Sequence, residues 1–276
     1  MSRRFDTSIT LDASPDTVWR ALVEADTLTQ WFATDAMIEP HPGGRYDISW
    51  HGDWPWKMTV LESIPGRRLR LRDPKAMPFD SAGQPLAQAE PVELVLEFHL
   101  EPAGAGTVLR LVHSGFGHGS QWDDELDGVS DGWQTELRIL QHYLGHHAGR
   151  PRRIVWARGA SSRPIDDVWA RLTVAGGLFD EGVLEHARPG TPVSLHIGPD
   201  VTVTGEVIFA LPKRHALVRA DNFGNGLMNV MVHRAGGAAG MQAVLSTWTE
   251  VTPEPGLFSR RAQERIDALG AVQVSG

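Results

Sequence analysis

Apolar residues in the first half of the chain follow two different periods. Alternation from Thr7 to Leu11 predicts an edge strand, because successive side chains of a strand point to opposite faces. Apolar residues at helical spacing predict a helix over about Pro15–Glu24, followed by a short turn around Leu28–Phe32. Glycine and proline residues separate the strands that are predicted after this turn. These strands are 45–51, 54–64, 67–72, 92–101 and 107–113.

A long helix closes the first half. Its apolar positions predict an end at Leu144 and a start at either Gln121 or Ser130. The proline-rich stretch 73–91 before it is predicted to be a loop. Strands bracketed by helices, instead of strands alternating with helices, favour an antiparallel α+β fold.

The second half repeats this order. Ala13–Leu22 returns as Ser162–Leu172, and each copy is predicted to carry a capping serine before a proline in the first turn of its helix. Val60–Arg68 returns as Val207–Arg214, and a closing helix ends at a glycine in both halves. The sequence therefore predicts a duplicated unit, with domains at residues 1–148 and 152–276.

Composition and charge exclude several classes of protein. The 276 residues include no cysteine, which excludes disulfides, a thiol nucleophile and cysteine-based metal sites. Residues 1–150 carry 13 Lys and Arg against 22 Asp and Glu, a net charge of −9, so no binding of nucleic acid is expected. No apolar run or signal core stands out, so no membrane insertion and a cytoplasmic location are expected.

Short motifs in the first half occur in the order and at the spacing of a known family. They are Ile9–Trp19, Leu28–Phe32, Gly43–Tyr46, Pro65–Leu69, Gly106–Leu109 and His113–Phe116. Because of these motifs, residues 5–147 resemble the activator-of-Hsp90-ATPase-like branch of the START/Bet v 1 (SRPBCC) helix-grip superfamily. The whole chain resembles a bacterial-type tandem protein of this kind. The second half lacks several of these motifs and looks like a divergent copy.

The resemblance implies two helix-grip domains, each a curved antiparallel sheet wrapped around a long C-terminal helix. It also implies a cavity between sheet and helix that holds an apolar ligand. Large side chains predicted to face inward are the candidate ligand contacts, although any one of them could instead be ordinary core. The candidates are Trp31, Phe32, Trp50, Trp56, Met58, Phe98, His113, Phe116, Trp122, Trp133 and Leu137.

Polar chemistry is sparse in the chain. His113 at the end of a strand is the best candidate for a general base, with His51, Trp122, Asp123 and Glu125 as possible neighbours; a structural histidine is the alternative. His142 and His146 have metal-competent spacing, but no local carboxylate completes a site, so no metal is expected. The acidic run 123–131 is interpreted as a solvated helix entrance.

Three functions follow as hypotheses. The first is binding of a small apolar or amphipathic ligand in the first domain, without a cofactor. In this hypothesis the second domain serves stability or an interface. The second is a chaperone-interaction module, which the family name suggests, and a homodimer is a further possibility. The third is a cofactor-free cyclase- or hydrolase-like enzyme, which we consider less favoured because fold alone does not establish an activity.

Overall fold

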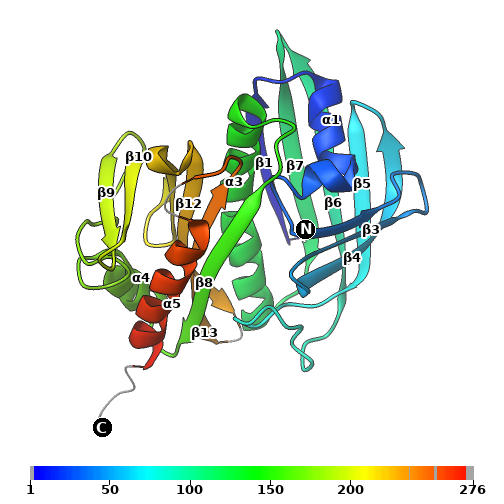
Figure 1. The fold of residues 1–276 in the computed structure, drawn as a ribbon. Coiled ribbons are helices and arrows are strands. Elements are labelled where there is room, and N and C mark those ends of the chain that lie inside the picture. Colours follow the sequence, from blue (N-terminus) through cyan, green and yellow to red (C-terminus); the bar gives the residue numbers. More distant parts are fainter. Residues whose placement is uncertain (1–2, 236, 252–253, 272–276) are drawn as a thin grey trace. The chain divides into compact units, whose positions relative to one another are not determined.

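Two antiparallel sheets, each followed by a long helix, make up most of the chain in the computed structural model (Figure 1). The structure describes residues 3–235, 237–251 and 254–271. The chain divides into two compact units, Met1–Arg150 and Pro151–Gly276. The predicted α+β class with two helix-grip domains is confirmed.

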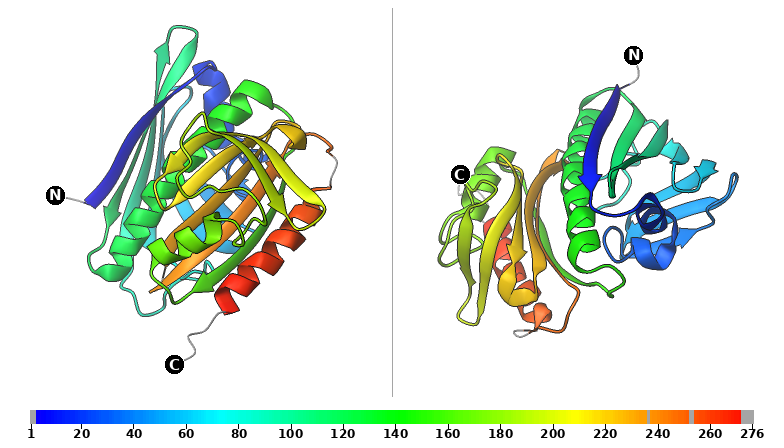
Figure 2. Two further views of the ribbon diagram at one scale, coloured as in Figure 1. Left: turned by 90° about the vertical axis from the view of Figure 1, so that its left-hand side faces the viewer. Right: turned by 90° about the horizontal axis from the view of Figure 1, so that it is seen from above.

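The first unit holds a seven-stranded sheet in the order β1-β7-β6-β5-β4-β3-β2, in which all neighbours are antiparallel. The helix α3 lies along one face of this sheet (Figure 2). The elements are β1 (Arg3–Leu11), α1 (Pro15–Val23), α2 (Ala25–Leu28), β2 (Asp35–Ile38), β3 (Arg45–Trp50), β4 (Asp53–Ile64), β5 (Arg68–Ala76), β6 (Val92–Ala103), β7 (Gly106–Phe116) and α3 (Ser120–His146).

Alternating side chains give this sheet its inner face. Along β6, Leu94, Leu96 and Phe98 are buried, while the residues between them are more exposed. The register places Phe98 beside Leu69 of β5 and Leu111 of β7, so one apolar layer runs across the strands. Since α3 covers this layer, burial of apolar surface joins the helix to the sheet.

The second unit repeats the topology with one strand fewer, in the order β8-β13-β12-β11-β10-β9. In place of β2 it has a single bridge between Glu181 and His196 of β9. Its elements are β8 (Arg153–Ser161), α4 (Ile165–Thr173), β9 (Pro192–Ile197), β10 (Val201–Leu211), β11 (His215–Ala220), the short 3-10 helix η1 (Asp221–Phe223), β12 (Gly226–Ala235), β13 (Ala238–Thr247) and α5 (Pro255–Ala271).

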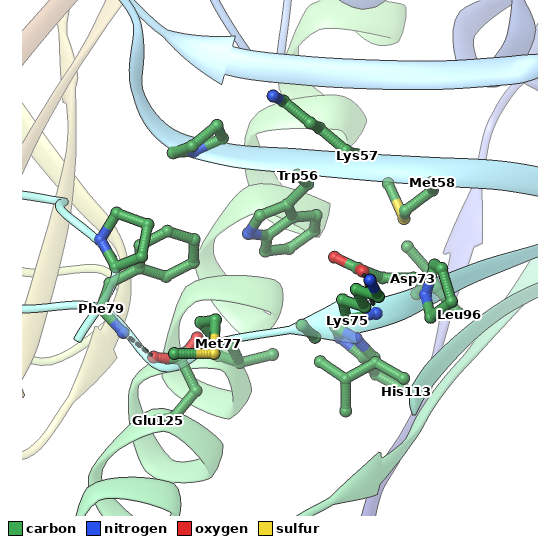
Figure 3. A pocket seen from close by; sticks show the side chains of 16 residues that line it. Trp56, Lys57, Met58, Asp73, Lys75, Met77, Phe79, Leu96, His113 and Glu125 are labelled. Atoms are coloured by element: carbon green, nitrogen blue, oxygen red, sulfur yellow. Dashed lines mark hydrogen bonds between the residues drawn. The ribbon is translucent and has the colours of Figure 1, made fainter. Parts of the chain in front are cut away.

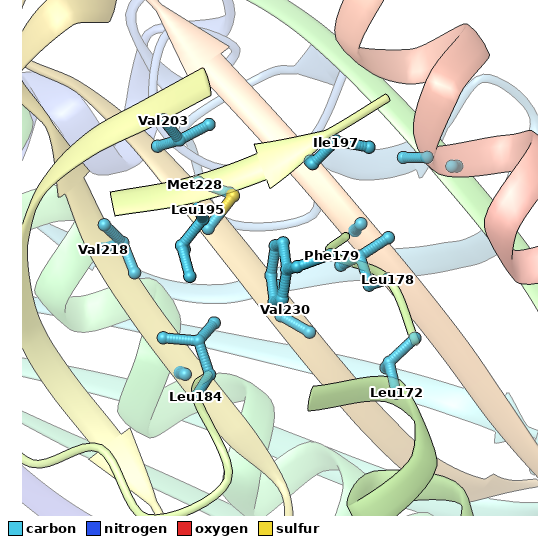
Figure 4. Close-up of a cluster of buried hydrophobic side chains, with 14 of the residues drawn as sticks. Leu172, Leu178, Phe179, Leu184, Leu195, Ile197, Val203, Val218, Met228 and Val230 are labelled. Atoms are coloured by element: carbon cyan, nitrogen blue, oxygen red, sulfur yellow. The ribbon is translucent and has the colours of Figure 1, made fainter. Parts of the chain in front are cut away.

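The core of the second unit is mostly aliphatic (Figure 4). Valine and leucine side chains from β9 to β12 meet residues from α4 and from the segment that follows it. Most of these side chains are 0–3% exposed, including Leu172, Phe179, Leu195, Val218 and Val230. The same topology is therefore filled with side chains of a different kind in each unit.

Several element boundaries differ from prediction. The long helix α3 begins at Ser120, which agrees with the earlier of the two predicted starts. The turn predicted around Leu28–Phe32 is the helix α2, which lies slightly earlier at Ala25–Leu28, and the edge strand β2 is not predicted at all. Only four residues long, β2 offers too little alternation for a period-two pattern to stand out.

The predicted serine caps hold for one helix and fail for the other. In α1, the Ser14 side chain accepts a hydrogen bond from the Thr17 N–H at 3.2 Å, with Pro15 in the first turn. In α4, Pro164 is the N-cap residue and no side chain caps the helix, so the predicted capping serine there is wrong. Because the helix begins one residue after this proline, Ser162 lies too far upstream to reach the first turn.

No helix among the described residues is long and apolar enough to span a membrane.

Ser14→Ala is expected to lower the free energy of unfolding by about 1 kcal/mol, because it leaves the Thr17 N–H without its side-chain acceptor. Ser162→Ala is the matched control and should change stability by a few tenths of a kcal/mol at most, within the usual range for surface substitutions. Urea unfolding followed by circular dichroism measures both. Equal losses in the two variants would contradict the assigned caps.

Candidate functional site

A pocket of about 330 Å³ opens in the first unit between β4, the end of β5, β6, β7, the start of α3 and the segment 77–85 (Figure 3). Aromatic and aliphatic side chains form most of its wall. The lining residues are Pro55, Trp56, Lys57, Met58, Asp73, Pro74, Lys75, Ala76, Met77, Phe79, Pro85, Leu94, Leu96, His113, Glu125 and Val129.

Behind the pocket lies a packed cluster of aromatic rings around Trp133 of α3. Phe32 stacks on the Trp133 ring with centroids 4.9 Å apart, and Trp31 stacks on Phe32 at 5.1 Å. Phe98 of β6 meets Trp133 edge-on at 5.8 Å. Rings at these separations interact favourably beyond the area they bury, so this side of the cavity is a rigid wall.

Trp56 of β4 links this cluster to the pocket. Its ring lies 6.0 Å from Trp133 and 5.7 Å from His113, and it is itself part of the pocket wall. From His113 the ring contacts continue to Phe116 at 4.9 Å and from Phe116 to Trp122 at 6.4 Å. One continuous aromatic network therefore runs from the core to the start of α3.

The structure brings most of the predicted ligand contacts together, but only three of them line the pocket. These are Trp56, Met58 and His113. The aromatic network joins the following nine: Trp31, Phe32, Trp50, Trp56, Phe98, His113, Phe116, Trp122 and Trp133. Leu137 is buried farther along α3 and does not reach the pocket wall. The other eight do not line this pocket; seven of them are buried and Trp50 is partly exposed.

His113 is a neutral hydrogen-bond donor in this geometry. The Trp133 Nε1–H donates to His113 Nδ1 at 3.3 Å, and since an indole can only donate, the ring carries its own proton on Nε2. Burial lowers the pKa of His113 to about 3. The ring thus presents an N–H to the pocket, which does not favour the predicted role of His113 as a general base.

The other predicted neighbours of His113 divide between the pocket and the surface. His51 is exposed in the turn between β3 and β4, and Asp123 forms a surface ion pair with Arg3 at 2.6 Å. Glu125 lines the pocket together with His113. The prediction that the acidic run 123–131 is solvated is therefore wrong for Glu125, although Asp123 and Asp127 are exposed.

Glu125 is held in the pocket wall by a single hydrogen bond. The backbone N–H of Phe79 donates to its Oε2 at 3.1 Å (Figure 3). Burial raises the pKa of Glu125 to about 7, and this hydrogen bond only partly offsets the effect. Helical spacing could have revealed its orientation, because Trp122, Glu125 and Val129 follow at intervals of three and four and share one face of α3.

A second carboxylate, Asp73, lies at the end of β5. Burial raises its pKa, helped by repulsion from Asp47 and opposed by a hydrogen bond from the Lys75 N–H at 3.0 Å. The side chains of Lys57 and Lys75 also line the pocket, but both residues are exposed. Sequence reasoning missed Asp73 and Lys75, because their stretch was predicted to be a loop and β5 in fact continues to Ala76.

The segment 77–91 is a folded flap. Asp80 accepts hydrogen bonds from the Ala82 and Gln84 N–H groups at 2.9 Å, and the Trp54 N–H donates to the Gly83 carbonyl at 2.8 Å. A side chain at Gly83 would come within 2.6 Å of the Trp54 ring, and the residue has a φ of +79°, so glycine is required there. The flap closes one side of the pocket with Phe79 and Pro85.

Within the described ranges, no group of three or more histidines and acidic residues is placed to hold a metal ion. The rings of His142 and His146 lie 4.7 Å apart at the end of α3.

Comparison with known proteins gives one family and several similar folds. The profile of the family "Activator of Hsp90 ATPase homolog 1-like protein" matches residues 12–145. Protein MLL2253 of Mesorhizobium loti is 23% identical with a TM-score of 0.44, and the match covers 52% of this chain and 97% of that one. The Aha1 dimer of Colwellia psychrerythraea is 22% identical, with a TM-score of 0.42 and coverage of 51% and 96%.

DynU16, a putative protein of the dynemicin biosynthetic locus, matches over both units. It is 15% identical with a TM-score of 0.43, and the match covers 98% of this chain and 96% of that one. No curated protein matches the chain in sequence.

Glu125→Gln is expected to stabilise the protein by an amount that grows as the pH rises from 4.5 through about 7. Below 4.5 the carboxyl is protonated in both the folded and the unfolded chain. Between pH 4.5 and about 7 the folded protein keeps a proton on Glu125 that the unfolded chain releases, so the free energy of unfolding of the wild type falls with rising pH. The amide has no such loss.

Urea unfolding at pH 4.5, 6 and 8 measures the difference between the variant and the wild type. Asp123→Asn, on the same helix turn but at the surface, is the control and should show no comparable trend. A constant difference between Glu125→Gln and the wild type across this range would contradict the raised pKa of Glu125 in its half-buried position.

Proposed function

Residues 12–145 belong to the activator of Hsp90 ATPase homologue 1-like family, and from this premise we propose that the first unit binds a small apolar or amphipathic molecule. The binding site in this proposal is the pocket between β4, β7, α3 and the flap. The observation that carries it is a preformed cavity with mostly apolar walls and a few polar groups, which is the usual character of a ligand site.

The size of the pocket limits the ligand. A volume of about 330 Å³ lies near the lower end of the ~300–1,000 Å³ typical of ligand pockets. A molecule with one ring or a short chain fits this volume, whereas a long acyl chain does not. Trp56 and Phe79 offer ring faces, and Met58 and Leu96 offer aliphatic surface.

The aromatic network behind the pocket supports the proposal energetically. Trp56 is fixed by contacts with Phe32, Trp50 and Trp133 before any ligand arrives. A wall that is already ordered loses little conformational entropy on binding, so more of the contact energy appears as affinity.

The family description supports a second candidate, stimulation of a chaperone ATPase by direct contact. An Hsp90 ATPase assay with the purified chain tests this function separately. An acid–base enzyme of the cyclase or hydrolase kind is less favoured, since His113 faces the pocket as a neutral donor with a pKa of about 3. Glu125 is the better-tuned group for such chemistry, because its pKa of about 7 lies near physiological pH.

Ala76→Phe is expected to abolish ligand binding by filling the pocket from the end of β5. Native mass spectrometry of freshly purified wild type should show a mass excess that denaturation removes, and saturation-transfer NMR should detect added indole or 2-phenylethanol. Both signals should be lost in the variant. Ala87→Phe, at an exposed position of the same flap, should keep them.

Wild-type protein that carries no excess mass and gives no saturation transfer with either probe would refute ligand binding at this site. Equal binding by Ala76→Phe and the wild type would place the ligand elsewhere in the chain and refute the pocket.

A further inference from the structure

The fold uses only one of the two ring nitrogens of His113. Its Nδ1 accepts from the Trp133 Nε1–H at 3.3 Å, which fixes the proton of the imidazole on Nε2. Among the described residues, no group accepts a hydrogen bond from this Nε2–H. His113 is only 3% exposed, so bulk solvent meets little of the ring either.

The unused N–H opens onto the pocket. His113 is part of the pocket wall, and Figure 3 shows its side chain among those of the other lining residues. Its Nε2 is not one of the described side-chain nitrogens that the protein encloses without a partner. Since Nδ1 is turned toward Trp133 in the core, Nε2 on the other side of the ring is the polar atom that meets the cavity.

The side chains packed around the His113 ring are apolar. Leu96 lies opposite His113 in the register of β6 and β7, and the rings of Trp56 and Phe116 lie 5.7 and 4.9 Å away. None of these three side chains can accept a conventional hydrogen bond. A buried N–H without a partner costs free energy, so an acceptor brought by a ligand would remove a cost that the folded chain carries.

The charged residues of the pocket do not pair with His113. Neither Asp73 nor Glu125 forms a hydrogen bond or an ion pair with it. Burial alone lowers the pKa of His113 to about 3, so the ring stays neutral at physiological pH. Lys57 and Lys75 line the pocket together with the two carboxylates, so the charges of the lining favour neither an anion nor a cation.

We propose that the pocket recognises an uncharged ring compound with a carbonyl group, and that His113 is the residue that recognises it. The carbonyl oxygen accepts from the His113 Nε2–H, and the ring of the ligand lies against Trp56, which adjoins His113. A carbonyl oxygen brings no proton of its own, so it needs no acceptor from the apolar side chains around His113. This inference rests on the proposed function and names its ligand class.

The contact is ordered before any ligand arrives. A free imidazole divides its proton between two nitrogens, whereas the Trp133 N–H selects one tautomer of His113. The ring contacts with Trp56 and Phe116 hold the plane of the imidazole. A donor that is already oriented loses little conformational freedom on binding, so more of its hydrogen bond appears as affinity. Trp133 is therefore a positioning residue for this contact.

The experiment compares acetophenone with α-methylstyrene, which has nearly the same shape but carries C=CH2 in place of C=O. Ligand-observed NMR titrations with the full chain give both dissociation constants. His113→Phe keeps a planar ring but removes the donor. It is expected to weaken acetophenone relative to α-methylstyrene by about fivefold, as for the loss of one neutral hydrogen bond.

Infrared spectroscopy of acetophenone labelled with carbon-13 at its carbonyl reads the hydrogen bond in the wild type, without any substitution. The C=O stretch of the bound ketone should lie below its position in an alkane solvent, and it should stay there from pH 5 to pH 9. The charged and titratable groups that line the pocket with His113 are Lys57 on β4, Asp73 and Lys75 on β5 and Glu125 on α3. If Glu125 were the donor, the shift would disappear as this carboxyl ionises around its pKa of about 7.

His118→Phe is the matched control, because His118 is exposed and does not line the pocket. It should leave both affinities and the position of the C=O stretch unchanged. His113→Phe also leaves the Trp133 N–H without its acceptor, so circular dichroism checks the fold of this variant. The infrared measurement on the wild type decides the question if the variant does not fold.

A C=O stretch at its position in an alkane, or one that changes through pH 7, overturns the inference and leaves the proposed function standing. Equal weakening of both probes in folded His113→Phe also overturns it. Binding of indole or 2-phenylethanol without binding of acetophenone overturns the inference alone. If none of the four probes binds, the proposed function itself fails, and the inference fails with it.

Discussion

The indole ring of Trp133 makes the contacts on which the architecture of the first unit depends. It projects from α3 onto the sheet, stacks on Phe32 and meets Phe98 edge-on, so a single side chain fastens the helix to the segment before β2 and to β6. Its N–H donates to His113 on β7 and is thereby satisfied within the core. A buried indole without such an acceptor would be costly, so the histidine is as much a partner of Trp133 as a residue of the pocket.

This fastening explains why the cavity lies where it does. Rings fill the space between α3 and the sheet around Trp133, and the pocket lies toward the start of α3 beside the flap, where the lining is mixed apolar and polar. The second unit has the same topology, but aliphatic side chains fill its core in place of an aromatic cluster. Duplication thus preserved the strand order while the side chains that shape an interior changed.

Periodicity predicted most strands of the first unit and both long helices, because each of these elements is long enough for its buried face to show as a regular pattern. The short strand β2 and the uncapped start of α4 were not predicted. A strand of four residues is too short to show alternation, and a single proline does not fix where a helix begins. For the site, the aromatic candidates were expected to face inward, but a pattern of burial cannot separate a residue that borders a void from one that fills the core. That distinction depends on the path of the flap and the extension of β5 to Ala76, which are tertiary features.

The electrostatic character of the pocket follows from this arrangement and reduces stability. Glu125 could have stayed in solvent like Asp123 two residues earlier, yet its place on the same helix face as Trp122 and Val129 turns it inward. The resulting desolvation is offset by the aromatic core, which stabilises the unit independently of this carboxylate. A structure that tolerates a half-buried acidic group without an ion pair in a partly apolar wall departs from what folding alone favours, and such departures concentrate where a protein meets its ligand. Glu125, rather than the apolar volume, is therefore the feature of the pocket wall that folding alone does not explain.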